Sequence, residues 1–173
     1  HVHSEKRNDE PARRDGEELV ATEWTPLAEA LDKQLRTSGK LAGVLSPHLT
    51  VEDAYLLANY LRSIDEDAKL YLGPVPLEGE DETFKSGFTI RAEKCPNRRG
   101  VEQVLTHFAG GVNTFEDFLA DAASGTVEAA WIAGGYKHDW HTPEAAESAS
   151  GLKLLIVQDM FSSPLWEQAD FQL

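Results

Sequence analysis

The sequence predicts an open, doubly wound α/β domain built on a mostly parallel five-stranded sheet with helices on both faces. Five short, nearly continuous apolar segments alternate with segments in which apolar residues recur at helical spacing. Strands of this kind are typical of parallel sheets that helices cover on both faces. The chain has 173 residues, which is enough for one such domain with its own core.

The N-terminal residues 1–23 are rich in charge and carry Pro11 and Gly16, so they are expected to form an arm or a short hairpin. Asp15 followed by glycine is a hairpin-turn signal. Residues 24–173 would then form the Rossmann-like domain.

Hydroxyl side chains followed by proline or by an acidic residue mark most of the expected helix starts. Thr25 before Pro26 is expected to cap the first helix, and Thr50 the second. The remaining helices are expected at residues 101–108, 115–124 and 144–150, with a short last helix after Ser163 and Pro164.

The five predicted strands cover residues 41–46, 69–73, 127–135, 153–159 and 170–173. A long irregular connection, residues 74–100, separates the second strand from the third. A connection of that length suits a crossing over the first strand, which gives the strand order 2-1-3-4-5. This order places a topological switch point between strands one and three, where sheets of this type bind their ligands.

Four residues at the carboxyl ends of these strands are candidate site residues: Ser46, Gly134, Gly135 and Asp159. Paired glycines allow the backbone to approach a phosphate closely. The Asp159 carboxylate could accept hydrogen bonds from a base or a sugar. A structural interpretation explains the same residues: the glycines would form a tight turn, and Asp159 would cap the helix that follows. The sequence leaves the ligand-binding and structural interpretations open.

Two histidines and a carboxylate, His138, Asp139 and His141, form the candidate metal group. A metal would need a further ligand, such as His48 or His107, and adjacent loop residues rarely converge on one ion. We therefore expect polar groups at the rim of the sheet and no metal. The two tryptophans at positions 131 and 166 are expected to pack in the core.

Composition excludes several classes of protein. The net charge of −14 argues against a nucleic-acid partner. No segment is long and apolar enough to insert directly into a membrane. The single cysteine, Cys95, cannot form an intramolecular disulfide, a four-thiolate zinc site or an iron–sulfur cluster. Few cysteines and no visible secretory signal favour a cytoplasmic location.

Four segments resemble the molybdopterin oxidoreductase superfamily. WTPLAEAL (24–31) and LTVEDAYLLANYLR (49–62) resemble helices of its pterin-binding part. AEKCPNRRGVE (92–102) resembles a stretch of the large iron–sulfur subunit, the 75 kDa subunit, of NADH–quinone oxidoreductases. The closing segment, residues 154–173, resembles the family's strand that ends in aspartate and continues into a short helix.

This resemblance implies an internal section of a larger electron-transfer chain whose iron–sulfur clusters lie upstream. It implies that the position of Asp159 corresponds to one that holds a guanine nucleotide in true pterin enzymes, and that Gly134 and Gly135 match the loop near its phosphates. Residues 65–76 lack the cysteine, asparagine and paired arginine that lead to a molybdenum ligand. The resemblance therefore favours the branch of the large iron–sulfur subunit, in which the pterin-type fold is retained as a scaffold.

The sequence thus predicts a scaffold and docking domain of an NADH dehydrogenase large iron–sulfur subunit, without its own redox centre. Its expected partners are other subunits of a membrane-associated electron-transfer complex, through which alone it would contact the inner membrane. One alternative is a molybdopterin guanine dinucleotide-binding fragment that uses the four candidate site residues. A second is a small α/β hydrolase or metal-binding domain that uses the histidine group.

Overall fold

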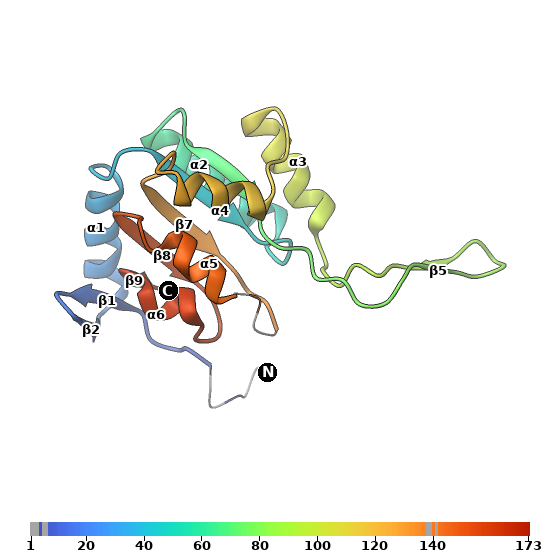
Figure 1. Ribbon diagram of the computed structural model, residues 1–173, viewed down its shortest axis with the longest axis horizontal. Helices are drawn as coiled ribbons and strands as arrows, with labels where there is room; N and C mark the ends of the chain where they lie inside the picture. The colour runs from blue at the N-terminus through green and yellow to red at the C-terminus, as the bar shows by residue number, and fades with distance from the viewer. Residues whose placement is uncertain (1–3, 5–6, 138–139, 141) are drawn as a thin grey trace.

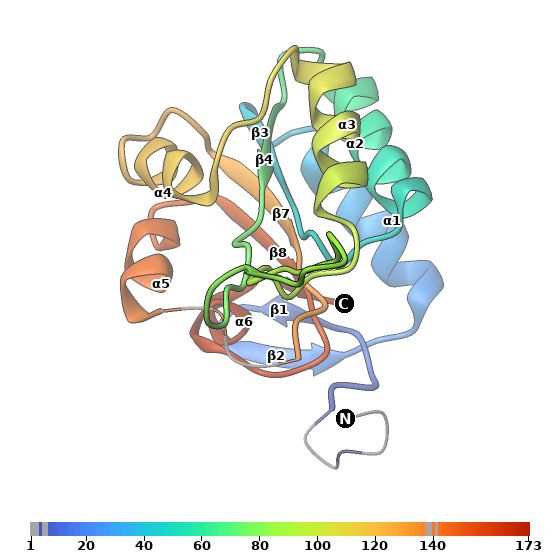
Figure 2. The same ribbon diagram turned by 90° about the vertical axis from the view of Figure 1, so that its right-hand side faces the viewer.

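A seven-stranded, mostly parallel sheet lies between two layers of helices in the computed structural model, which describes residues 4, 7–137, 140 and 142–173 (Figures 1 and 2). The sheet contains β1 (Ala12–Asp15), β2 (Glu18–Ala21), β3 (Leu41–Leu45), β4 (Lys69–Leu72), β7 (Ala129–Ala133), β8 (Leu154–Gln158) and β9 (Phe171–Gln172). The helices are α1 (Trp24–Leu35), α2 (Val51–Ile64), α3 (Arg98–Ala109), α4 (Phe115–Ala123), α5 (Pro143–Ala149) and α6 (Pro164–Gln168).

The five predicted strands are present as a parallel set, but the sheet is larger than predicted. Its order is β2-β1-β9-β8-β7-β3-β4. The neighbours β4-β3-β7-β8-β9 are all parallel, with Val44 opposite Ile132 and Ile132 opposite Val157. The predicted count of five, and with it the full order, is wrong because the N-terminal hairpin adds two antiparallel strands at β9.

The N-terminal hairpin itself forms as predicted. Asp15 pairs with Glu18, and Gly16 at the turn has φ of 66°, a conformation that glycine adopts without a steric penalty. The hairpin joins the sheet where Arg13 pairs with Phe171. Its strands are short and largely exposed, and the apolar run at residues 19–21 is too short to indicate that they belong to the sheet.

Each face of the sheet has its own helical layer and its own apolar core (Figure 2). Helices α1, α2 and α3 bury one set of apolar side chains, and α4, α5 and α6 bury the other. Because side chains alternate along a strand, Leu45 faces the first layer and Val44 the second. The doubly wound architecture is therefore confirmed.

Four hydroxyl residues cap helices as their sequence positions indicate. Thr50, Thr114, Thr142 and Ser163 each accept a hydrogen bond from the backbone N–H three residues on. The prediction for the first helix is wrong, because α1 begins one residue before Thr25, with Glu23 at the N-cap. Helix α3 likewise begins earlier than predicted, at Arg98.

The long connection between β4 and α3 forms an arm, residues 74–97, that extends away from the sheet (Figure 1). It contains a small antiparallel hairpin of β5 (Glu82–Thr83) and β6 (Thr89–Ile90). Phe84 and Phe88 lie exposed at its tip. None of the helices in the described residues is long and apolar enough to cross a membrane.

Candidate functional site

The switch point lies between β3 and β7, because α2 follows β3 on one face of the sheet and α5 follows β7 on the other. All four predicted site residues lie at this carboxyl edge. The Ser46 N–H donates to the carbonyl of Ala133, and the Gly134 N–H donates to the carbonyl of Gln158. These two bonds hold the ends of β3, β7 and β8 together.

Asp159 anchors the loop that follows β7. Its Oδ1 accepts hydrogen bonds from the Gly135 N–H at 3.1 Å and from the Met160 N–H at 2.7 Å. Its Oδ2 accepts a bond from the indole N–H of Trp140 at 2.8 Å. Burial raises the pKa of the Asp159 carboxyl above its usual range, while these three donors and the nearby His48 act in the opposite direction.

The two glycines fit this local packing. A Cβ added at Gly134 would overlap the Asp159 carboxylate, so only glycine allows the carboxylate to lie against the backbone here. Gly135 has φ of +93°, a value that side chains other than glycine's rarely adopt. Since both glycine N–H groups already donate within the protein, neither is available to a phosphate in this conformation.

Ser46 is completely buried and does not line the cavity described below. Its Oγ accepts a hydrogen bond from the His48 N–H at 3.0 Å. The neighbouring Tyr136 donates its hydroxyl to the carbonyl of Pro74 at 2.8 Å. The Tyr136 ring packs against Trp140 with a centroid separation of 4.4 Å and meets His48 edge-on at 4.8 Å. These rings cover the carboxyl edge of the sheet. No motif in the sequence indicates this role for Tyr136 or Trp140.

The candidate metal residues His138, Asp139 and His141 lie outside the described residues. Among the residues that the structure describes, no group of three or more histidine, cysteine or acidic side chains is arranged to hold a metal ion.

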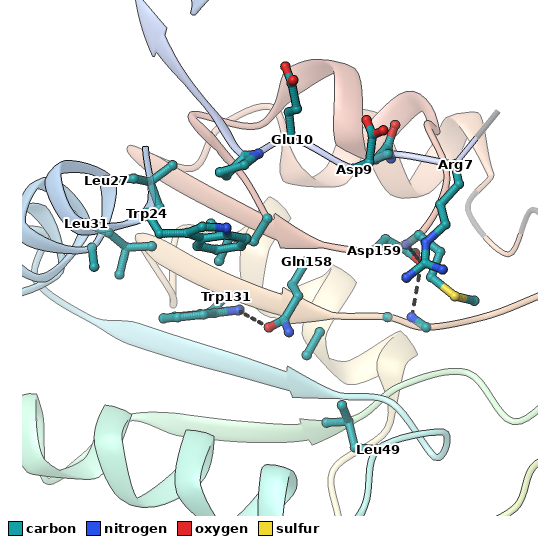
Figure 3. A pocket seen from close by; sticks show the side chains of 18 of the residues that line it. Arg7, Asp9, Glu10, Trp24, Leu27, Leu31, Leu49, Trp131, Gln158 and Asp159 are labelled. Carbon is teal, nitrogen blue, oxygen red and sulfur yellow. Dashed lines mark hydrogen bonds between the residues drawn. The ribbon is translucent and has the colours of Figure 1, made fainter. Parts of the chain in front are cut away.

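A cavity of about 1160 Å³ opens beside this edge, on the face that α1 and α2 cover (Figure 3). Gly134, Gly135 and Asp159 line one end of it. Its other lining residues come from the N-terminal segment, α1, the loop before α2, α2 itself, β7, the end of β8 with the residue that follows Asp159, and the last residue of the chain: Ser4, Arg7, Asn8, Asp9, Glu10, Pro11, Trp24, Leu27, Ala28, Leu31, Asp32, Leu49, Tyr60, Trp131, Ala133, Gln158, Met160 and Leu173.

Aromatic side chains from the sheet and from α2 meet within the cavity. The Trp131 indole N–H donates to the Gln158 side-chain oxygen at 3.3 Å, and its ring meets Tyr60 edge-on at 6.2 Å. The Tyr60 hydroxyl donates to Asp32 at 2.8 Å, and Asp32 forms an ion pair with Arg36 at 2.9 Å. The prediction that Trp131 packs in the core is only partly right, since the ring is half-buried and lines the cavity, whereas Trp166 is buried.

The lining of the cavity is mainly negative. Asp9 and Glu10 are exposed on the N-terminal segment, and hydrogen bonds from neighbouring side chains lower the pKa of Asp32, which favours its charged form. Among the lining residues that the structure describes, Arg7 carries the one guanidinium, and Asp159 is a fourth carboxyl group, although burial raises its pKa and Arg36 pairs with Asp32. This electrostatic field disfavours a phosphate-bearing ligand.

Two buried tyrosines, Tyr71 and Tyr136, and the half-buried Tyr60 should make the protein sensitive to alkali. Burial and the hydrogen bond to Asp32 raise the pKa of Tyr60 to about 12, and burial also raises the pKa of Tyr71 and of Tyr136. The folded state therefore holds these tyrosines in their neutral form. The stability that comes from their neutral form is fully present below pH 10 and is lost as the pH rises through about 12. Near-ultraviolet absorbance should show these three tyrosines ionising together with unfolding. Ionisation of all three near pH 10 in the native protein would contradict the burial described.

No family model matches the chain, and no curated protein matches it significantly.

Proposed function

We propose that this chain is a scaffold and docking domain of an electron-transfer protein related to the large iron–sulfur subunit of NADH–quinone oxidoreductases, with no redox centre of its own. One observation carries the proposal. The polar groups at the switch point, where related folds hold a nucleotide, are bonded to one another. Asp159 holds its own loop, and the Gly134 and Gly135 amides have internal acceptors.

The charge of the cavity supports the same proposal. A guanine dinucleotide would bring a pyrophosphate into a space with four carboxyl groups and one guanidinium. Bound phosphates are usually met by backbone N–H groups at a helix start or by arginine and lysine side chains. Among the described residues that line the cavity, Arg7 alone would have to supply that charge.

The arm supports a docking role. It projects from the sheet (Figure 1) and exposes large apolar side chains, with Leu77 71% and Phe88 65% accessible. Exposed apolar groups clustered on a projecting hairpin are typical of protein contact surfaces. An element of this kind reaches a neighbouring subunit without rearrangement of the sheet.

A molybdopterin guanine dinucleotide-binding fragment is the second candidate. The cavity favours it, because Gly134, Gly135 and Asp159 line a large opening at the switch point. Binding by these groups would require the nucleotide to replace the hydrogen bonds from Trp140 and Gly135 to Asp159.

Thermal unfolding with and without guanosine diphosphate separates the two functions. A ligand at a hundred times its dissociation constant adds about 2.7 kcal/mol of stability. For a domain of this size that corresponds to a rise of roughly 5–10 °C in Tm. We expect no rise beyond that produced by adenosine diphosphate. A rise specific to the guanine nucleotide would refute the scaffold assignment in favour of the second candidate.

The parent gene provides an independent test. The proposed function predicts that the coding sequence upstream of His1 specifies a cysteine-rich, ferredoxin-like segment. An upstream sequence without clustered cysteines would contradict it.

A further inference from the structure

Part of the central sheet is left uncovered. Strands β7 and β8 have neighbours on both sides, and such central strands are normally covered by helices on both faces. However, Gln158 at the carboxyl end of β8 is exposed, and Trp131 in the middle of β7 is half-exposed toward the layer of α1 and α2. We call this opening the β7–β8 groove, defined by the lining residues of the cavity above.

The groove has apolar walls as well as an apolar floor. Leu27 and Leu31 of α1 face it, and Trp24 at the start of α1 stands at its edge with 59% of its surface exposed (Figure 3). Leu49 and Leu173 also line it. At about 1160 Å³ the groove is larger than the roughly 300–1,000 Å³ typical of small-molecule sites. Its size therefore suits several side chains of a polypeptide.

The rim of the groove is acidic. Figure 3 shows Arg7, Asp9 and Glu10 along one side of the cavity and Trp131 and Gln158 along the facing side. Neither Asp9 nor Glu10 makes an ion pair with any residue that the structure describes, and both are exposed. These two carboxylates are therefore available to a cationic partner. Complementary charge speeds the association of two proteins and fixes how they align.

Charge also disfavours the simplest alternative occupant. A second copy of this chain would bring another net charge of −14 to an acidic rim. Two of its arginines, Arg91 and Arg98, are already paired with carboxylates of the same chain. The groove thus favours a partner of opposite charge over self-association.

We infer that the β7–β8 groove is the docking site for an amphipathic segment of a partner protein that carries lysine or arginine among apolar side chains. The apolar side chains pack on the half-exposed Trp131, and the cations lie near Asp9, Glu10 and the face of Trp24. This inference rests on the proposed docking function and deepens it by naming the surface and the chemistry of the partner.

A designed pair of peptides tests the chemistry. The probe is a fluorescein-labelled peptide of sequence LKKLLKLLKKLLKL, which presents lysines on one helical face and leucines on the other. The control peptide has glutamate at every lysine position. In fluorescence anisotropy at about 0.15 M salt, the lysine peptide should bind with a dissociation constant on the order of micromolar, and the glutamate peptide at least about tenfold more weakly. Failure of the lysine peptide to bind would overturn the inference.

Matched variants test the location. Asp9→Lys combined with Glu10→Lys should weaken binding about tenfold, whereas Glu78→Lys combined with Glu80→Lys, the same charge change on the arm, should leave it nearly unchanged. Trp24→Ser should weaken binding about fivefold, and Phe88→Ser, which removes an exposed aromatic ring outside the groove, should not. Equal losses in the groove and arm variants would show non-specific attraction and would overturn the site.

The outcomes separate the two proposals. If the lysine peptide fails to bind while guanosine diphosphate leaves Tm unchanged and the upstream gene is cysteine-rich, the docking function stands and the groove assignment falls. A guanine-specific rise in Tm removes the docking function itself. Sedimentation measures whether the protein forms a dimer. A dimer that is altered by the changes at Asp9 and Glu10 would identify a second copy as the occupant of the groove and refute the inference.

Discussion

Replacing Phe118 by alanine is expected to lower the free energy of unfolding by about 3–5 kcal/mol, the range for a buried phenylalanine. Phe118 lies on α4 and is completely inaccessible to solvent. Its ring meets Tyr71 of β4 edge-on at 5.5 Å and stacks on Phe115 at 5.7 Å. The change would therefore open a cavity between the second helical layer and the sheet. Denaturant unfolding followed by circular dichroism measures the loss.

Phe88→Ala is the matched control for this change. Phe88 is also a phenylalanine, but it is 65% exposed at the tip of the arm. Its removal should change the free energy of unfolding by less than about 0.5 kcal/mol. If both variants unfold at the wild-type midpoint, α4 does not cover the sheet as described.

Replacing Asp159 by alanine is expected to cost about 2–4 kcal/mol of stability, because a buried donor left without a partner costs about 1–3 kcal/mol. The carboxylate accepts bonds from Trp140, Gly135 and Met160, and its loss leaves these N–H groups without their acceptor in a largely buried setting. The same denaturant unfolding measures the effect, and Asp67→Ala, at an exposed aspartate, should change stability by less than about 0.5 kcal/mol.

The contact between Asp159 and Gly134 sharpens this prediction. Gly134→Ala should also be destabilising, because the new methyl group would overlap the Asp159 carboxylate. With alanine at both positions that overlap disappears, so the double variant should be more stable than the sum of the single losses predicts. Strict additivity would show that the carboxylate does not lie against the Gly134 backbone.

The parallel core of the fold could be predicted because its signals are local. Each of the five strands is an apolar run, and hydroxyl residues such as Thr50, Thr114 and Thr142 mark the starts of the helices between them. The relative order of these strands followed from the length of the 74–100 connection. Pattern and topology were sufficient here because burial on both faces leaves one consistent arrangement.

The edge of the sheet could not be predicted in the same way. Strands β1 and β2 are short and largely exposed, and the pairing of β1 with β9 depends on backbone hydrogen bonds between segments far apart in the sequence. Backbone pairing at an exposed edge leaves only a weak signal in side-chain type. The sequence therefore indicates the hairpin turn at Gly16 but not where the hairpin docks.

The positions of the candidate site residues could be predicted, but their bonding could not. Strand ends determine that Ser46, Gly134 and Asp159 share one edge. The loop after β7 determines that Trp140 reaches Asp159, and no sequence pattern specifies that loop. Trp131 illustrates the same limit. The sequence around a tryptophan on a central strand looks the same whether a helix covers that tryptophan or a groove exposes it.

The indole N–H of Trp140 offers the most direct test of whether the switch point holds its own loop rather than a nucleotide. Proton–nitrogen correlation spectra of the labelled protein report this group and the Gly135 and Met160 amides individually. We predict that all three are protected from hydrogen exchange, and that an excess of guanosine diphosphate leaves their positions unchanged. Rapid exchange of the indole proton without ligand, or a saturable shift of these signals with the nucleotide, would contradict the proposed scaffold role.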